Sequence, residues 1–118
     1  MICYTHQSAE GAKVVERVLQ SCGVPYVTRR HTVRERKWLA FVHQPILSEV
    51  VYRKLIAVRS EDVPAIRVAE LIAGVRDVQW ERVDRVTPDG DCAYRTADGR
   101  IRGIVLGKKV EFAAPGGS

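Results

Sequence analysis

Two tight-turn sequences in the last third of the chain constrain its fold more than any other feature. Thr87-Pro88-Asp89-Gly90-Asp91 and Ala97-Asp98-Gly99-Arg100 each place a glycine, which tolerates positive φ, beside residues that favour turns. Apolar and polar residues alternate around these turns, from Val78 to the first turn and then over 92–96, 101–106 and 110–112. A period of two between short turns predicts a C-terminal four-stranded antiparallel β-meander.

The first third of the chain predicts a β-α-β start. Met1 to Tyr4 is a short apolar run typical of a strand, and Val24 to Arg30 reads as a second strand with a proline near its start. Between them, Ser8 is suited to an N-cap and Gly23 to the residue after a helix. The apolar residues of this helix repeat on one face, at Val14, Val15, Val18, Leu19 and Cys22. The spacing suits a right-handed unit with a parallel pair of strands.

The middle of the chain gives weaker patterns. Thr32 and Glu35 match a capping box before the apolar run 38–42 and predict a second helix ending near Pro45, although this run also fits a buried strand. The segment 48–58 fits a helix or a strand. Residues 61–73 predict a helix with Pro64 in its first turn, a stop at Gly74, and one apolar face formed by Ala65, Val68, Ala69 and Ile72.

These patterns together predict an α+β fold class: an N-terminal β-α-β start with further helices, then the meander. At 118 residues the chain has the size of one domain. We therefore expect a single α+β domain over 1–112 and a flexible C-terminal tail over 113–118, where Ala-Ala-Pro-Gly-Gly-Ser shows no periodicity.

The opening segment resembles the start of glutaredoxin and thioredoxin-fold proteins. Cys3-Tyr4-Thr5, a helix and then Gly23-Val24-Pro25-Tyr26 follow one another as in that family, and Val63-Pro64 echoes its proline dipeptide. The resemblance covers about the first 28 residues and implies a shared fold at this end. It implies no redox activity, because Gln7-Ser8-Ala9 stands at the helix start where the family needs a reactive cysteine.

Charge is distributed unevenly along the chain, whose net charge is +5. Residues 29–59 carry eight basic and two acidic residues, whereas residues 60–91 carry four basic and eight acidic ones. The basic segment therefore faces either a polyanion or the acidic segment, within one chain or across a dimer. The charge pattern and the edges of the meander together predict a two-fold homodimer.

The densest basic stretch, 29–37, is the candidate binding site. Its arginines and lysine are suited to phosphates, and the aromatic ring that follows is suited to stacking on an unpaired base. A solvated helix start, with the tryptophan in the core, is the alternative interpretation. The candidate residues are Arg29, Arg30, His31, Arg34, Arg36, Lys37 and Trp38. This predicts a non-enzymatic binding module, with nucleic acid as one polyanion that it would contact.

The sequence signals for other functions are weaker. A small hydrolase or nuclease using His31 or His43 with nearby arginines is the alternative function, and a small-molecule pocket between the helices and the meander is a third. His6 and Gln7 follow the first strand, where open sheets often bind ligands. Cys3-x-x-His6 offers only two ligands, so we expect no metal site, and no motif indicates a cofactor.

The sequence also bears on where the chain works. It contains no apolar run of the roughly 20 residues that a membrane-spanning helix needs, and its first residues do not form an export signal. Three widely spaced cysteines are most simply free thiols. We therefore expect a cytoplasmic protein without membrane partners.

Overall fold

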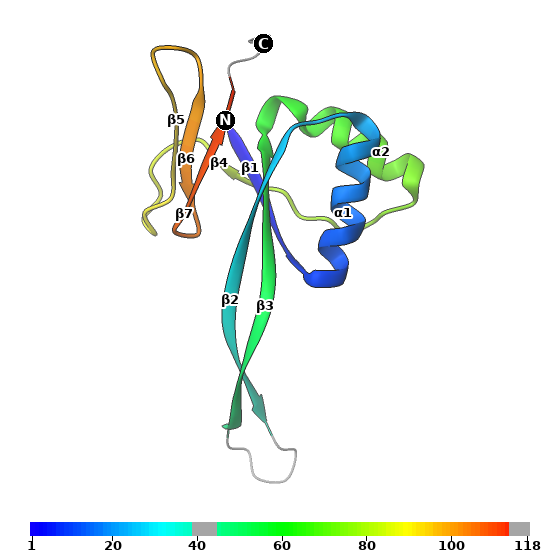
Figure 1. Ribbon diagram of the computed structural model, residues 1–118, viewed down its shortest axis with the longest axis vertical. Coiled ribbons are helices and arrows are strands. Elements are labelled where there is room, and N and C mark those ends of the chain that lie inside the picture. The colour runs from blue at the N-terminus through cyan, green and yellow to red at the C-terminus, as the bar shows by residue number, and fades with distance from the viewer. Residues whose placement is uncertain (39–44, 114–118) are drawn as a thin grey trace.

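The computed structural model describes residues 1–38 and 45–113; over 34–38 and 45–50 it describes the backbone only. Within these residues the protein is mixed α+β, with two α-helices and two antiparallel sheets, which confirms the predicted class (Figure 1). The elements follow in the order β1 (Ile2–Ser8), α1 (Ala9–Cys22), β2 (Tyr26–Trp38), β3 (Pro45–Arg59), a 3-10 turn (Ser60–Asp62), α2 (Val63–Ala73), β4 (Glu81–Val83), β5 (Cys92–Arg95), β6 (Ile101–Val105) and β7 (Lys108–Phe112).

The larger sheet has four strands in the order β2-β3-β1-β4, and all neighbouring strands are antiparallel. Strands β1 and β2 run in the same direction, but β3 lies between them. The element order β-α-β-β-α-β is that of the ferredoxin-like split β-α-β arrangement. The predicted β-α-β start is therefore correct in element order, whereas the predicted pairing of its two strands is wrong. The fold implied by the resemblance to thioredoxin-fold proteins is also wrong at this end, because β1 and β2 are not paired with each other.

The smaller sheet is a three-stranded meander, β5-β6-β7. Both predicted turns are present: Gly90 donates from its backbone N–H to Thr87 (3.0 Å), and Gly99 donates to Thr96 (3.0 Å). The strand predicted to begin near Val78 forms as β4, but its predicted place in the meander is wrong, because Val83 pairs with Ile2 of β1 in the other sheet. An alternating pattern predicts a strand but carries no information about which sheet receives it.

Helix α1 begins and ends where its sequence predicts. The Ser8 hydroxyl accepts a hydrogen bond from the backbone N–H of Gly11 (3.2 Å). Gly23 closes the helix with a φ of 68°, a left-handed conformation that glycine adopts without steric cost. The predicted apolar face is confirmed at its centre, where Val15 and Leu19 are buried.

The second predicted helix is wrong, because Thr32 to Trp38 belong to strand β2. Strand β2 pairs along its length with β3, from Tyr26 opposite Val58 to Trp38 opposite Pro45. These cross-strand hydrogen bonds outweigh the local preference of a capping box. The segment that fitted a helix or a strand, 48–58, is also strand.

The four-stranded sheet lies between the helices and the three-stranded sheet (Figure 1). On one face, Ile56 and Val58 pack against Val15, Leu19 and Ile66 of the helices. On the other, a second cluster joins β1, β3 and β4 to the meander through Ile2, Leu55, Ala57, Val83, Ala93, Ile101, Val105, Val110 and Phe112. The helices and the meander are thus separated by a sheet, and the pocket predicted between them is wrong.

Strands β2 and β3 continue beyond the body of the protein as a two-stranded hairpin (Figure 1). Strand β1 ends at Ser8, which pairs with Arg53. Beyond this pair, the described backbone of residues 32–38 has residues 45–52 as its strand partner, and neither segment pairs with β1.

Helix α2 forms over the predicted residues but turns a different face to the core. Ile66 and Glu70 are buried, whereas Val68 and Ile72 from the predicted apolar face are 58% and 82% exposed. Leu71 beside them is 81% exposed. No helix within the described residues is long and apolar enough to cross a membrane.

Candidate nucleic-acid interface

Strand β2 presents basic side chains to both faces of its sheet. Arg29 and Arg30 are consecutive, so their side chains leave the strand on opposite sides. Arg29 donates from Nε to the main-chain carbonyl of Lys109 in β7 (3.0 Å) and from Nη1 to that of Thr28 (2.9 Å). Arg30 lies on the helix side, where its guanidinium carbon is 4.1 Å from the centre of the Tyr52 ring.

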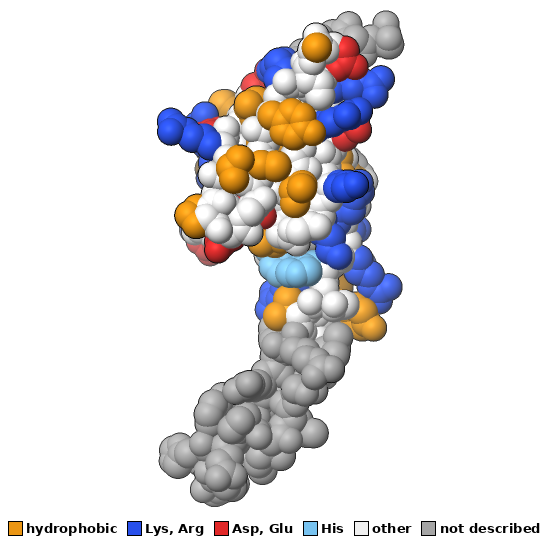
Figure 2. All heavy atoms as spheres, turned by 90° about the vertical axis from the view of Figure 1, so that its left-hand side faces the viewer, with side chains coloured by type: hydrophobic (Ala, Val, Ile, Leu, Met, Phe, Trp, Pro, Cys, Tyr) orange, Lys and Arg blue, Asp and Glu red, His pale blue; other side chains and the backbone are white. Residues whose placement is uncertain are grey.

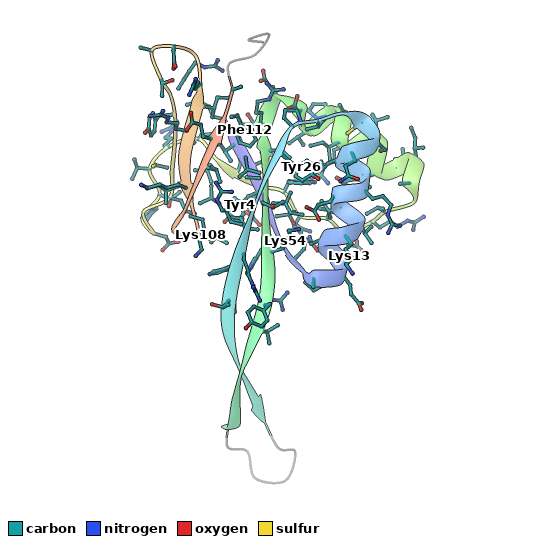
Figure 3. The ribbon with its side chains drawn as sticks, in the orientation of Figure 1. Tyr4, Lys13, Tyr26, Lys54, Lys108 and Phe112 are labelled. Atoms are coloured by element: carbon teal, nitrogen blue, oxygen red, sulfur yellow. The ribbon has the colours of Figure 1, made fainter. Side chains whose placement is uncertain are left out.

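On the helix side, a cavity of about 380 Å³ opens between the start of α1 and the hairpin. We call it the basic pocket, and its lining is formed by Ala9, Lys13, Arg30, Tyr52, Arg53 and Lys54. Figure 3 shows Lys13 on α1 and Lys54 on β3 on this side of the sheet. Four of the six lining residues are basic and none is acidic, so the pocket attracts anions.

Lys54 of the basic pocket is held in an ion pair with α1. Lys54 donates from Nζ to both carboxylate oxygens of Glu16, each at 3.0 Å. Glu16 is 19% exposed and Lys54 38%, so solvent screens the pair only in part. The pair fixes α1 against β3 and leaves the positive charge of Lys13 and Arg30 uncompensated by Glu16.

Two histidines meet on the opposite face of the sheet. His31 Nδ1 lies 2.9 Å from His6 Nε2, and their ring centres are 4.8 Å apart. Burial lowers the pKa of His6, and the nearby charges of His31 and Arg53 lower it further. The contact needs one ring nitrogen with a proton and one without, so it cannot form when both rings are charged.

The predicted candidates His6 and Gln7 belong to β1 itself and line a cavity of about 300 Å³. Asp77 and Glu81 line the same cavity, so it lacks the uniformly basic character of the basic pocket. Within the described residues, no three His, Cys, Asp or Glu side chains are grouped to hold a metal ion. Cys3, Cys22 and Cys92 are free, and burial raises the pKa of the Cys3 thiol.

The predicted basic stretch divides into two parts. Arg29, Arg30 and His31 lie where β2 borders the body of the protein. The remaining candidates, Arg34, Arg36, Lys37 and Trp38, continue along β2 in the projecting hairpin, and their side chains lie outside the described part of the chain, as does all of His43.

Sequence reasoning missed Lys13, Tyr52, Arg53 and Lys54 as site residues. The excess of basic residues over 29–59 included the two from β3, but their proximity to Arg30 depends on the pairing of β2 with β3. Lys13 gave no such indication, because a lysine on the polar face of an amphipathic helix is the usual pattern.

Comparison with protein-family models, with curated proteins and with solved structures finds no significant match to this chain.

Proposed function

We propose that this chain is a non-enzymatic binding module for the phosphate backbone of a nucleic acid, with strand β2 and the basic pocket as its contact surface. The observation that carries the proposal is the gathering of four basic side chains from α1, β2 and β3 around one cavity without an acidic lining residue. Lysine and arginine bind phosphates by charge and hydrogen bonds, and nucleic acids present phosphates in series.

The shape of β2 and β3 adds to this argument. The hairpin continues strand β2 away from the body, and the backbone of Arg34, Arg36 and Lys37 lies on this continuation. A small anion would use the pocket alone. The arrangement is therefore better suited to a polymer of phosphates than to a single phosphate.

The test is a titration of a fluorescently labelled oligonucleotide between about 50 and about 200 mM salt. Binding should weaken steeply with salt, and Lys13→Ala with Arg30→Ala should reduce the log–log slope by about two, one for each phosphate contact. The charge-matched control is Arg76→Ala with Arg85→Ala, at two exposed arginines that line neither the basic pocket nor the cavity on the face of the three-stranded sheet. Arg85 follows Val83, which pairs with Ile2 at the end of β1 away from the pocket.

An unchanged slope in the pocket variant, or an equal reduction in the control, would contradict the proposal. The alternative of a nuclease that uses His31 or His43 is examined on the same samples by the length of the oligonucleotide after incubation with and without Mg²⁺. If the wild-type protein shortens the oligonucleotide and His31→Ala or His43→Ala abolishes this cleavage, the protein is a nuclease and not a binding module. A thermal-shift screen of mononucleotides addresses the small-molecule alternative.

We also propose that the module is a homodimer joined through α2. The support is the exposed apolar surface formed by Val68, Leu71 and Ile72, beside a cavity of about 430 Å³ between α1 and α2. Exposed apolar surface of this kind is typical of contact sites. Light scattering at several concentrations should give a dimer that Leu71→Glu converts to a monomer, whereas Val86→Glu, at another exposed apolar residue, should not. A wild-type monomer at every concentration would contradict the dimer.

A further inference from the structure

A second basic surface lies on the outer face of the three-stranded sheet. A hollow of about 390 Å³ there is lined by residues that include Tyr94 and Ile104, which are 50% and 37% exposed. Figure 2 shows this side of the molecule, where hydrophobic side chains are bordered by lysine and arginine. We call this the sheet hollow. An exposed tyrosine on a rigid sheet offers a flat surface on which a planar ring can stack.

The charged residues around the sheet hollow favour an anionic ligand. Arg29, Arg102 and Lys109 line it together with one acid, Glu111. Glu111 is held by two arginines, Arg100 at 3.1 Å and Arg102 at 3.4 Å, so its charge is largely balanced. Arg29 is fixed at the rim by its hydrogen bonds to two main-chain carbonyls. A phosphate beside Tyr94 would therefore meet two cations whose positions are already set, Arg29 and Arg102.

Arg29 and Arg30 connect the sheet hollow to the basic pocket. They are neighbours on β2, which is the edge strand of its sheet, and each lines one of the two surfaces. Each surface also holds a tyrosine that is about half exposed, Tyr94 in the hollow and Tyr52, at 54%, in the pocket. A ligand that uses both surfaces has to bend across the width of one strand.

A duplex does not satisfy this geometry. Its bases are stacked inside, so their faces are closed to tyrosine, and it is stiff over about 150 base pairs. A single strand bends freely and exposes its bases. We infer that the ligand is single-stranded nucleic acid, with an unpaired base stacked on Tyr94 and phosphates at Arg29 and Lys109. This inference rests on the proposed function and adds the class of nucleic acid to it.

The experiment compares labelled oligo-dU, oligo-U and a DNA duplex of the same length by fluorescence anisotropy. The wild-type protein should bind both single strands more tightly than the duplex. Tyr94→Leu should weaken single-strand binding by at least about fivefold, which corresponds to the lower limit for one stacked base. Tyr94→Phe keeps the ring and should retain wild-type affinity. The two single strands differ in the 2′-hydroxyl, so the ratio of their affinities shows whether the protein prefers RNA or DNA.

The melting temperature of each variant establishes that it is folded, and Tyr94→Ala serves as a second variant without a ring. Equal binding of duplex and single strand, or full affinity in both ringless variants, would overturn the inference even if the pocket variant Lys13→Ala with Arg30→Ala lost binding. Failure of the wild-type protein to bind any of the three probes would instead overturn the proposed function.

Discussion

His6 of β1 and His31 of β2 contact each other through ring nitrogens 2.9 Å apart, although β3 lies between their strands. The register explains the contact: Leu55 of β3 is opposite both His6 and Arg29, and His31 lies two residues further along β2 on the same face. The pair therefore links the two strands that flank β3 at the place where the hairpin leaves the body.

This contact predicts a pH dependence of stability. The pKa of His6 is lowered in the folded state, so the unfolded chain binds more protons and the free energy of unfolding rises with pH. The contribution is complete above the unfolded pKa of about 6.5 and is lost as the pH falls through the folded value. Measured by urea unfolding between about pH 7 and about pH 5, the free energy of unfolding should rise with pH by less than about 1.4 kcal/mol per pH unit. His6→Phe should reduce this slope. An equal slope in His6→Phe would exclude His6 as its source.

Asp84 gives a second titration, which NMR reports directly. Its carboxylate accepts hydrogen bonds from Arg82 and from the terminal ammonium group of Met1, both at 2.8 Å. These contacts, that of Arg82 first, lower the pKa of Asp84 to about 2. Arg82→Gln should raise the titration midpoint of the Asp84 carboxyl carbon toward the ordinary value of about 3.9. A midpoint near the ordinary value in the wild-type protein would show that the contacts do not persist in solution.

Glu70 should contribute to stability through the indole of Trp80. Its buried carboxylate accepts a hydrogen bond from Trp80 Nε1 at 2.9 Å and lies 3.8 Å from Arg67. Glu70→Ala removes this acceptor and should cost about 1–3 kcal/mol in urea unfolding. Glu70→Gln keeps an oxygen for the indole and should cost less. Equal losses in both variants would mean that the charge, and not the hydrogen bond, is what matters.

Gly103 of β6 allows the two sheets to approach each other. A Cβ there would meet the main-chain oxygen of Cys92 and lie 2.7 Å from Cδ1 of Ile2, and the backbone cannot move aside easily. Gly103→Ala should therefore cost about 1–3 kcal/mol. Gly11→Ala is the matched comparison, because its new methyl meets only side chains of Gln7 and Ser8 and alanine favours the helix. A stable Gly103→Ala protein would contradict the close packing of the sheets.

Glu16 should oppose binding, since it occupies Lys54 of the basic pocket. On the proposed function, Glu16→Gln releases this cation and should tighten oligonucleotide binding at low salt by up to about fivefold, or about 1 kcal/mol. Glu10→Gln changes the same charge in the first turn of α1 and serves as the control. Weaker binding in Glu16→Gln would mean that the ion pair holds Lys54 in its productive position.

The elements that the sequence predicted correctly are those set by local chemistry. Ser8 marks the start of α1 and Gly23 its end, and Gly99 forms the predicted turn. Each of these residues determines the backbone conformation only within a few positions of itself. The helix predicted to start at Thr32 was wrong for the opposite reason. Thr32 pairs instead with Tyr52 of β3, which is distant in sequence, and this pairing outweighs the local helix signal. The placement of β4 beside β1 is equally non-local.

The candidate site divides in the same way. Arg29 and Arg30 were predictable because basic residues cluster in the sequence, and the structure places them on the two sides of β2. Lys13 and Lys54 join Arg30 only after α1 and β3 have packed on one face of the sheet. Tyr94 lay in a predicted strand, but its exposure follows from which face of the meander covers the core.

The position of β3 between β1 and β2 has a consequence for biosynthesis. Strand β1 emerges from the ribosome before either of its neighbours in the sheet, β3 and β4, has been made. Until β3 has been translated, β1 lacks its backbone partners from Arg53 to Arg59, and α1 has only part of the surface on which it packs. The nascent chain thus has to keep the apolar segment of β1 from aggregating until β3 has been synthesised.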